Sequence, residues 1–347
     1  MKILLGMSGG LDSTYAAHKL LRCGHTVEGA VLKMHRYTEI SDARLAAENM
    51  GIPLHVIDAE AEFESCVVEN FISEYLKGRT PNPCIVCNSD VKFRLLFDFA
   101  VKNGFDAIAT GHYAEVVKCG DRYAVKRGRD FSKDQSYMLW RIPQDILAKL
   151  IFPLADEEKK LIREDARAEG IVAADRDESQ EICFIPSGDY AEFIESRTQP
   201  SPHGNFIDKE GKILGEHKGI IRYTVGQRKG LGIALGERVF VTDINAEDNT
   251  VTLSPDDSFS DVVFVSGAVF SGIKEPAKNE KIELSVKVRY LAKPIPCTVQ
   301  YLGDGRAKAN LTLPQRAVTA GQSAVFYLGE VVAFGAFIDS SERQKAL

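Results

Sequence analysis

Near the N-terminus the sequence reads Gly6-Met7-Ser8-Gly9-Gly10-Leu11-Asp12-Ser13. This stretch follows the short apolar run Ile3–Leu5, which is typical of a strand, and it precedes a helical pattern over Thr14–Arg22. Its glycines allow the backbone to turn sharply and to approach a ligand closely, while its hydroxyl and N–H groups lie at the positive end of the expected helix. The stretch therefore predicts a phosphate-binding loop at the carboxyl end of a strand, as in open α/β sheets.

The spacing separates this loop from the common phosphate loop G-x-x-x-x-G-K-[ST], because no lysine follows its glycines. An isolated S-G-G is more often a plain turn, but the position between a strand and a helix favours nucleotide binding. The pattern S-G-G-x-D-S resembles the PP-loop of the ATP pyrophosphatases. Those enzymes hold the β and γ phosphates of ATP as a leaving group while an acceptor attacks the α phosphate, so the resemblance implies an adenylated intermediate.

Composition bounds the class of protein. A chain of 347 residues with 44% hydrophobic content predicts two or three globular domains with ample cores. The N-terminal apolar run is too short for a signal peptide and no run approaches the length of a membrane span, so we expect a cytoplasmic protein without a membrane partner. Seven scattered cysteines predict reduced thiols rather than a secreted disulfide framework.

The charge is unevenly distributed along the chain. The totals of 43 basic and 49 acidic residues do not by themselves favour a nucleic-acid partner. However, residues 118–141, 217–238 and 271–310 each carry four more basic than acidic side chains. If these segments share one face, they would bind phosphates; ordinary solvated surface is the alternative.

The N-terminal part alternates strand-like runs with amphipathic helical patterns. Strands are expected over residues 3–5, 27–33, 54–57 and 107–110, and helices over 14–22, 42–50, 62–76 and 91–102. This alternation predicts a Rossmann-like α/β domain with a parallel sheet covered on both faces. Beyond about residue 200 the pattern becomes mostly β. A linker-like stretch at 199–204 and a weaker break near Pro255 divide the chain into residues 1–200, 201–258 and 259–347.

A second constellation lies between two helical patterns and reads Thr80-Pro81-Asn82-Pro83-Cys84-Ile85-Val86-Cys87-Asn88. Its two prolines predict a stiff loop that holds Cys84 and Cys87 in a turn rather than in a core. A C-x2-C pair suits a zinc half-site, a redox pair, an iron–sulfur ligand pair, or a nucleophile with its neighbour. Structural zinc is the less favoured of these, because a closed site needs four ligands and the chain has no second C-x2-C.

The third constellation runs from Asp177 to Pro186 and contains Cys183 within Ile-Cys-Phe-Ile. Taken alone, this cysteine would be assigned to a core, since free cysteine is among the most buried residue types. Together, however, S-G-G-x-D-S, N-P-x-x-x-C-N and S-Q-x-I-C-F-I follow the order of the tRNA-specific 2-thiouridylases, and the chain resembles that family over nearly its whole length. Tyr223–Gly232 and Val288–Tyr290 also fit the family's pattern.

The resemblance implies an adenine-nucleotide alpha hydrolase (PP-loop) domain that binds ATP, then a small central β-rich domain and a C-terminal β-barrel that contacts tRNA. It also implies a reaction in which ATP, with Mg²⁺, adenylates the C2 oxygen of the wobble uridine in certain tRNAs and releases pyrophosphate. A persulfide on Cys183 then delivers sulfur to C2, giving 2-thiouridine and AMP. Cys87 takes the family's nucleophile position and resolves the bond as a disulfide. The implied partners are tRNA and a sulfur donor or sulfur-carrier protein, and the expected state is a monomer.

Other functional positions follow from the same resemblance. Residues Gly6–Ser13 would bind the ATP phosphates, with Asp12 acting through Mg²⁺, and Leu32 and Gly111 would contact the nucleoside. The positions implied to contact tRNA are Asn82, Pro83, Cys84, Lys133, Asp134, Gln135, Arg289 and Tyr290. Lysine beside phosphate and an aromatic ring beside a base suit RNA recognition. For His112 three roles stay open: a catalytic base, a contact with the nucleotide or a satisfied loop histidine, and we expect a role near ATP.

The chain departs from the family's pattern at Cys84, where many members carry Asp. Three thiols, Cys84, Cys87 and Cys183, would then suit a [4Fe–4S] cluster with one open iron, as another route to the same thiolation. Other PP-loop enzymes, such as amide-forming synthetases or tRNA lysidine synthetases, share the loop without needing the cysteine pair. A nucleotide- and zinc-binding module without catalysis is the non-enzyme alternative.

Overall fold

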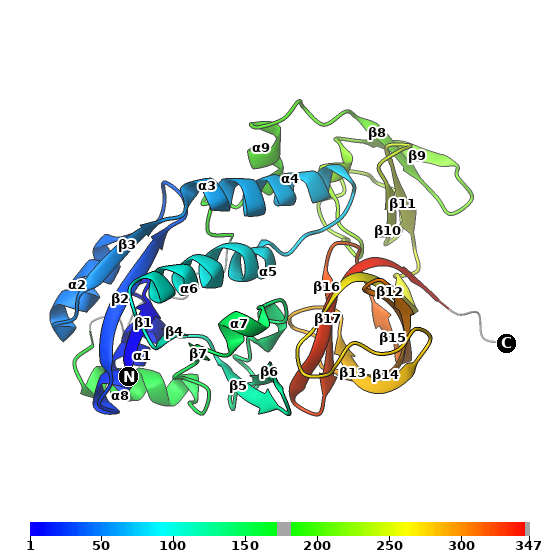
Figure 1. Cartoon of the computed structure of the whole chain (residues 1–347). Coiled ribbons are helices and arrows are strands. Elements are labelled where there is room, and N and C mark those ends of the chain that lie inside the picture. The colour runs from blue at the N-terminus through cyan, green and yellow to red at the C-terminus, as the bar shows by residue number, and fades with distance from the viewer. Residues whose placement is uncertain (172–181, 344–347) are drawn as a thin grey trace.

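The computed structural model describes residues 1–171 and 182–343, and its first region is an α/β domain built on a five-stranded sheet (Figure 1). The strands, in the order β3-β2-β1-β4-β7, are β1 (Lys2–Gly6), β2 (Thr26–Lys33), β3 (Leu54–Asp58), β4 (Ala107–Thr110) and β7 (Leu150–Ile151). Each neighbouring pair is parallel. The predicted parallel sheet is therefore confirmed.

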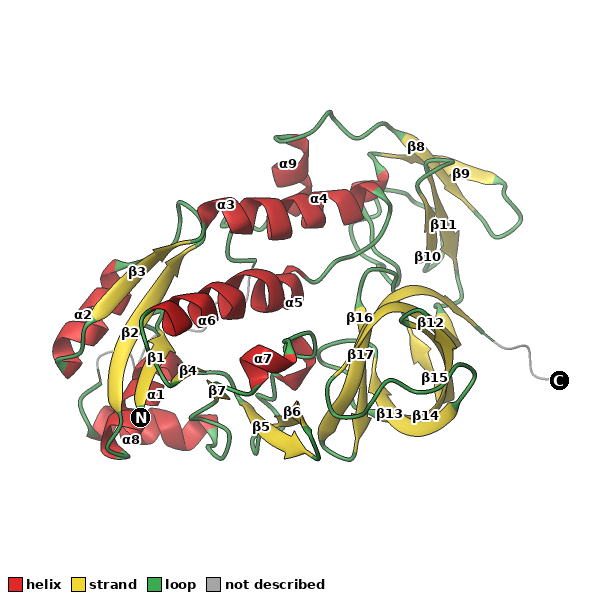
Figure 2. Cartoon of the chain, in the orientation of Figure 1, coloured by secondary structure: helices red, strands yellow, loops and turns green. Residues whose placement is uncertain are grey.

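Helices cover both faces of this sheet (Figure 2). The helices of this part of the chain are α1 (Leu11–Arg22), α2 (Ser41–Met50), α3 (Glu60–Phe63), α4 (Glu69–Leu76), α5 (Pro83–Val86), α6 (Phe93–Lys102), α7 (Gln144–Leu147), α8 (Lys159–Ala168) and α9 (Tyr190–Glu195), with π-helical segments η1 (Glu64–Val68) and η2 (Cys87–Lys92) and a 3-10 turn η3 (Ser136–Met138). Along β1, Ile3 and Leu5 pack with α1, α2 and α8, whereas Leu4 packs with α3 to α6. Burial on both faces explains why the centre of this strand, Ile3–Leu5, is apolar at every position. Within the described residues, none of the helices is long and apolar enough to cross a membrane.

The segment predicted to be a stiff cysteine loop is helical. The side chain of Asn82 accepts a hydrogen bond from the Cys84 N–H at 3.2 Å, and Pro83 occupies the first helical position of α5. These are helix-start signals, so the prolines begin the helix rather than break it. Helix α5 continues through η2 into α6. The prediction that Cys87 lies in a turn outside a core is wrong, because this residue begins η2 and is only 7% exposed.

The second region is a small β domain. Its strands, in the order β10-β11-β8-β9, are β8 (Gly204–Ile207), β9 (Ile213–His217), β10 (Phe240–Asn245) and β11 (Thr250–Ser254), with a 3-10 turn η5 (Ile220–Arg222) between β9 and β10. The β8–β11 pair is parallel and the other two pairs are antiparallel. Phe206, Val241 and Val251 are buried and belong to the same hydrophobic core as the helices of the first domain.

The third region is a closed barrel of antiparallel strands. They are β12 (Phe259–Phe270), β13 (Lys281–Lys287), β14 (Ile295–Gly303), β15 (Arg306–Arg316), β16 (Ser323–Leu328) and β17 (Val331–Glu342). The order is β12-β15-β14-β13-β16-β17, and β12 pairs with β17 to close the barrel. Closure leaves no free sheet edge between these strands. The predicted C-terminal β-barrel is confirmed.

The barrel is joined to the first domain by a hairpin and by a buried tryptophan. The hairpin consists of β5 (Ala114–Cys119) and β6 (Arg122–Arg127). It extends the barrel sheet because Lys126 pairs with Val331 of β17. Trp140 packs so closely on Gly335 that an added Cβ would lie 2.3 Å from the indole ring, and its Nε1 donates to Ser323 Oγ at 3.1 Å. The two regions therefore share a tightly packed interface.

All three regions meet at Thr80. Its backbone N–H donates to Ala320 O at 2.9 Å, and its carbonyl accepts from Gln322 Nε2 at 2.8 Å, both in the β15–β16 connection of the barrel. Its hydroxyl lies 3.4 Å from the Thr224 hydroxyl in the second region. Since α5 begins three residues later, contacts from all three regions fix the start of the cysteine-bearing helix.

Candidate active site

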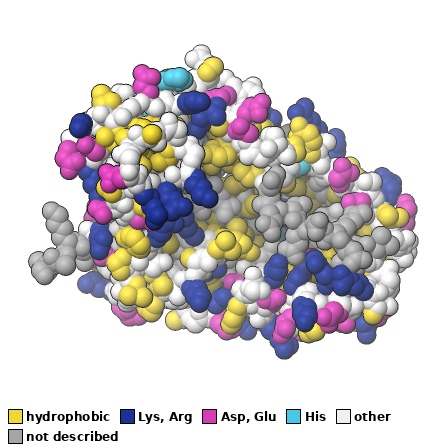
Figure 3. Space-filling view, turned by 180° about the vertical axis from the view of Figure 1, so that it is seen from behind, with side chains coloured by type: hydrophobic (Ala, Val, Ile, Leu, Met, Phe, Trp, Pro, Cys, Tyr) yellow, Lys and Arg dark blue, Asp and Glu magenta, His cyan; other side chains and the backbone are white. Residues whose placement is uncertain are grey.

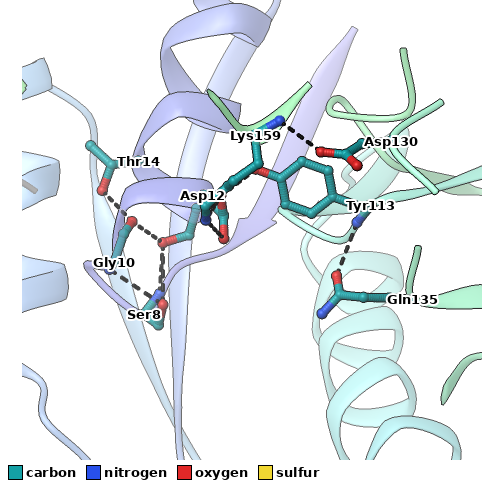
Figure 4. Close-up of polar contacts among 9 residues, drawn as sticks. Ser8, Gly10, Asp12, Thr14, Tyr113, Asp130, Gln135 and Lys159 are labelled. Carbon is teal, nitrogen blue, oxygen red and sulfur yellow. Dashed lines mark hydrogen bonds and ion pairs between the residues drawn. The ribbon is translucent and has the colours of Figure 1, made fainter. Parts of the chain in front are cut away.

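The predicted phosphate loop connects β1 to α1 (Figure 4). The Ser8 N–H donates to Ser13 Oγ at 3.2 Å, and the Ser13 hydroxyl donates to Gly10 O at 3.1 Å. Gly9 has φ +77°, and a Cβ there would lie 2.3 Å from the carbonyl carbon of Asp42, so only glycine fits. The loop is thus folded tightly against the N-terminus of α1, where the helix dipole and N–H groups favour an anion.

Asp12 is held by a lysine from a distant part of the chain (Figure 4). Lys159, the first residue of α8, places Nζ 2.6 Å from both carboxylate oxygens of Asp12. Tyr113 OH donates to Asp12 Oδ1 at 2.6 Å, and the Lys159 N–H donates to Asp130 Oδ2 at 3.1 Å. Helix α8 therefore supplies the cation that the loop lacks. Lys159 was not among the predicted site residues, because no local pattern links it to the loop.

A cleft of about 540 Å³ opens at the carboxyl ends of β1, β2 and β4. Its lining includes Leu32 near the end of β2, Gly111 just after β4, and the loop residues Gly6, Met7, Ser8, Asp12 and Ser13. The chain crosses here from β3 to β4 on the other side of β1, which is the switch point at which open α/β sheets bind ligands. The structure thus brings most of the residues predicted to bind ATP into one space.

We expect Gly111→Ala to weaken ATP binding about tenfold, because a Cβ at Gly111 would lie 2.8 Å from the backbone of Asp12. The substitution would push the end of β4 away from the first turn of α1. Titration calorimetry with a nonhydrolysable ATP analogue measures the effect. Gly120→Ala is the control: its φ of +64° strains the β5–β6 turn, but a Cβ there meets nothing within 4 Å, so the change leaves the packing of β4 on α1 untouched. An unchanged affinity in Gly111→Ala would contradict the role of this close packing.

His112 lines the same cleft and packs against two aromatic rings that also contact each other. The ring centroids of Phe93 and Phe152 lie 5.6 and 5.9 Å from that of His112, and its Nδ1 is 2.8 Å from Thr110 Oγ1. Burial, with a smaller effect from the charge of Lys92, lowers the pKa of His112 to about 3. The imidazole is therefore neutral at physiological pH and is available as a hydrogen-bonding group rather than as a cation.

The three motif cysteines gather beside the cleft. Cys183 lines it and is exposed, Cys84 is also exposed, and Cys87 is buried with its Sγ 3.7 Å from Met34 Sδ. Burial raises the pKa of Cys87 to about 12, with smaller contributions from Cys84 and Cys183. Loss of water around the sulfur atoms also raises the pKa of Cys84 and of Cys183. All three are free thiols, so the expected disulfide between Cys87 and Cys183 is not formed in this structure.

The arrangement of these thiols does not fit the iron–sulfur alternative. Among residues 1–171 and 182–343, no three His, Cys, Asp or Glu side chains are grouped so that they could hold a metal ion. A [4Fe–4S] cluster needs its thiolate ligands in direct reach of iron. The departure from the family's pattern at Cys84 therefore adds an exposed thiol in α5 without building a cluster site. The first half of the third motif, residues 177–181, lies outside the described residues.

The predicted tRNA-contact residues fall into two groups around α5 and the cleft. Asn82 caps α5, and Pro83 and Cys84 form its first turn. Gln135 lines the cleft described above, and its Oε1 accepts the Tyr113 N–H at 3.0 Å (Figure 4). Cys84 lies within electrostatic range of Cys183, which lines the same cleft. The residues predicted to meet the target base are thus close to the cleft that the residues predicted to bind ATP line.

Asp134, by contrast, faces the interior. Its side chain is 1% exposed, and its Oδ2 lies 3.0 Å from Arg127 Nε and 4.0 Å from Lys287 Nζ, at the end of β13. Its Oδ1 accepts the Ser136 N–H at 3.0 Å. The carboxylate therefore links the first domain to the barrel, whereas the neighbouring Lys133 is partly exposed.

Arg289 and Tyr290 follow β13 where the barrel meets the other regions. Arg289 Nη2 donates to Thr319 Oγ1 at 2.9 Å and to Val225 O, in the second region, at 3.4 Å. The ring centroid of Tyr290 lies 6.1 Å from that of Tyr137 in the first domain. Both residues therefore lie at the junction of the three regions.

A basic hollow lies beside α8. It has a volume of about 440 Å³ and is lined by Lys133, Lys159, Lys160, Arg163 and Arg167, together with Asp130, Ser132 and Glu164. Figure 3 shows Lys and Arg side chains gathered along the edge of the molecule where α8 runs. Because Lys159 also contacts Asp12, this hollow adjoins the phosphate loop.

Family models match the chain in three consecutive segments. The model described as tRNA methyl transferase HUP domain matches residues 1–187, and the tRNA methyl transferase PRC-barrel domain matches residues 191–255. The aminomethyltransferase beta-barrel domain matches residues 263–338. Each matched segment falls on one of the three regions described above.

Curated relatives match over nearly the whole chain. A protein of Geotalea uraniireducens named tRNA-specific 2-thiouridylase MnmA is 41% identical over 99% of this chain and 96% of its own length. The proteins of the same name from Clostridium acetobutylicum and Clostridium beijerinckii are 41% and 42% identical over 97% and 98% of this chain, and each is covered over 99% of its length.

Proposed function

Since the chain belongs to the family of tRNA-specific 2-thiouridylases, we propose that it converts the wobble uridine of certain tRNAs into 2-thiouridine in an ATP-dependent reaction. One observation supports this beyond the family itself. The phosphate loop and Cys183 line the same cleft, so activation by ATP and delivery of sulfur act on one bound base. The protein is thereby a tRNA-uridine 2-sulfurtransferase.

The first step is activation of the uridine. ATP binds with its phosphates against Gly6–Ser13 and its nucleoside against Leu32 and Gly111, the C2 oxygen of uridine attacks the α phosphate, and pyrophosphate leaves. The ammonium of Lys159 beside the loop favours this step, because it offsets negative charge on the leaving phosphates. Asp12 provides a carboxylate of the kind that Mg²⁺ uses together with phosphate oxygens, and bound Mg²⁺ would neutralise further charge.

The second step transfers sulfur in two bond exchanges. The terminal sulfur of a persulfide on Cys183 attacks C2, a C–S bond replaces the C–O bond, and AMP leaves with the oxygen and its electron pair. The thiolate of Cys87 then attacks Cys183 Sγ, the persulfide S–S bond breaks, and sulfur stays on C2 with that electron pair. A disulfide between the two cysteines forms, and an external thiol reductant returns both to thiols.

The persulfide route is preferred over the iron–sulfur route because the described side chains do not form a cluster site. Amide or lysidine formation by a PP-loop enzyme needs no cysteine pair, so neither activity would explain Cys87 and Cys183. A nucleotide sensor would leave the match to 2-thiouridylases over 97% or more of the chain unexplained.

The RNA is proposed to lie across the cleft and the basic hollow beside α8. The target base lies next to Asn82–Cys84, Lys133 and Gln135 contact the RNA beside it, and Arg289 and Tyr290 contact a more distant part. Cations beside phosphates and an aromatic ring beside a base are what RNA recognition favours. We also propose that the protein acts in the cytoplasm as a monomer and receives sulfur from a donor or carrier protein.

The test is a product assay on unmodified tRNA. We expect the protein, incubated with tRNA, ATP, Mg²⁺ and a persulfide source, to release pyrophosphate and to give 2-thiouridine in the mass spectrum of the digested RNA. Reactions without ATP and with tRNA that lacks a wobble uridine are the controls. ATP binding without tRNA-dependent pyrophosphate release would favour a nucleotide-binding module instead.

A further inference from the structure

Lys92 is the last residue of the π-helical segment η2, and Cys87 is the first. In a π-helix, hydrogen bonds join residue i to residue i+5, so residues five apart lie on nearly the same side. In an α-helix the same spacing would separate them by about 140° around the axis. The widened turn between α5 and α6 therefore brings the Lys92 side chain round toward the Cys87 thiol and into the cleft that Cys183 also lines.

The Lys92 ammonium is held in place by a hydrogen bond to a neutral side chain. Its Nζ donates to Asn88 Oδ1 at 3.0 Å, and Asn88 Nδ2 donates to Met138 O at 3.0 Å, which fixes the orientation of the amide. Within the part of the chain that the structure describes, Lys92 forms no ion pair. The neighbouring carboxylate of Asp90 is paired with Arg141 Nη1 at 2.7 Å. Among the described residues, the positive charge of Lys92 therefore faces the cleft without a salt-bridge partner.

Several titratable groups surround this charge. Those that face Lys92 are Cys84, Cys87, Cys183, His112 and Asp90, and the cleft beyond them also carries Asp12, His35, Tyr37 and Glu39. Burial raises the pKa of each of the three thiols, and the charge of Lys92 acts against that effect at all three. His112 is neutral, and Asp90 has its own cation. Lys92 is thus the one positive charge in this group of described residues that favours the anionic form of all three thiols.

We propose that Lys92 is a positioning residue for sulfur transfer, which stabilises the anionic sulfur of Cys87 and of the Cys183 persulfide without touching the RNA. This inference rests on the proposed function. In the second bond exchange Cys87 loses its proton to water and its sulfur becomes an anion in a buried place, where an uncompensated charge is strongly unfavourable. A fixed ammonium lowers that free energy more in a site that excludes water than it would in solution.

The first test measures the thiols in the full chain without ATP or tRNA. Rates of alkylation by iodoacetamide are followed against pH for each cysteine separately, by peptide mass spectrometry. In Lys92→Gln, which keeps a donor for Asn88 but loses the charge, we expect alkylation of Cys183 and Cys87 near neutral pH to fall about tenfold, as one unit of pKa implies. Lys92→Arg should restore the wild-type profile, and Lys102→Met, at the exposed end of α6, should leave it unchanged.

The second test asks which step of the reaction depends on Lys92. With tRNA and ATP, Lys92→Gln is expected to release pyrophosphate at the wild-type rate but to form 2-thiouridine about tenfold more slowly. An unchanged alkylation profile in Lys92→Gln overturns the role of Lys92, and so does a profile that Lys92→Arg fails to restore. A wild-type protein that makes no 2-thiouridine, yet shows the alkylation shift in Lys92→Gln, overturns the proposed function and leaves the electrostatic role of Lys92 standing.

Discussion

Cys183→Ser and Cys87→Ser are each expected to lower the formation of 2-thiouridine about a thousandfold or more while tRNA-dependent release of pyrophosphate continues. A serine at position 183 cannot carry a persulfide, so no sulfur reaches C2. A serine at position 87 cannot form the disulfide that frees the product. The two variants should therefore stop at different points, which a single assay of the product would not distinguish.

The stopping points can be measured separately. Cys87→Ser, loaded with persulfide, should accumulate RNA bound to Cys183 through a disulfide, visible as a slower band on a denaturing gel and released by dithiothreitol. Cys183→Ser should give no such band. Cys23→Ser, which alters an exposed cysteine at the end of α1, is the control and should behave as wild type. Full activity in either motif variant would rule out the proposed sulfur route.

Asp134→Ala should lower the free energy of unfolding by about 3–5 kcal/mol. The wild-type carboxylate is 1% exposed, and its removal leaves Arg127 and Lys287 without their shared counter-ion. Lys287 is only 6% exposed, and burial lowers its pKa while Asp134 acts against that decrease. Scanning calorimetry, followed at several pH values, measures the loss.

The sign of the pH dependence follows from Lys287. The pKa of this lysine is lower in the folded state than in the unfolded chain, so protonation favours unfolding. The resulting loss of stability is largest at low pH and diminishes as the pH rises toward the pKa of the unfolded chain. The difference in the free energy of unfolding between the wild type and Asp134→Ala should therefore become smaller at alkaline pH. The matched control is Asp121→Ala, which removes an exposed pair with Lys274 at 3.5 Å across the same two regions and should change stability by less than about 1 kcal/mol. Equal effects of the two substitutions would contradict the buried linkage.

The sequence predicts the sheet well because its signals are local. The run Ile3–Leu5 is apolar at each position since both faces of β1 are covered, and alternating helices then require a parallel sheet. The cysteine helix was predicted wrongly for an equally local reason. Two prolines were taken as signs of a loop, whereas Asn82 followed by Pro83 is a cap and a first helical residue.

Other features depend on tertiary contacts that no local pattern contains. Lys159 reaches Asp12 across 147 residues of chain, and only the packing of α8 on α1 brings the two side chains together. Asp134 was predicted as a tRNA contact beside Lys133, but the docking of the barrel buries its carboxylate. The closeness of Lys92 to Cys87 depends on one π-helical turn, because regular α-helical spacing would have separated them.

The contacts of Thr80 link the positions of the three regions to one another. Thr80 hydrogen-bonds to the barrel, lies beside Thr224 of the second region, and leads within three residues into the helix that carries Cys84 and Cys87. A tilt of the barrel would therefore act as a lever on that helix. The position of the barrel and the position of the cysteine-bearing helix are therefore mechanically coupled through Thr80.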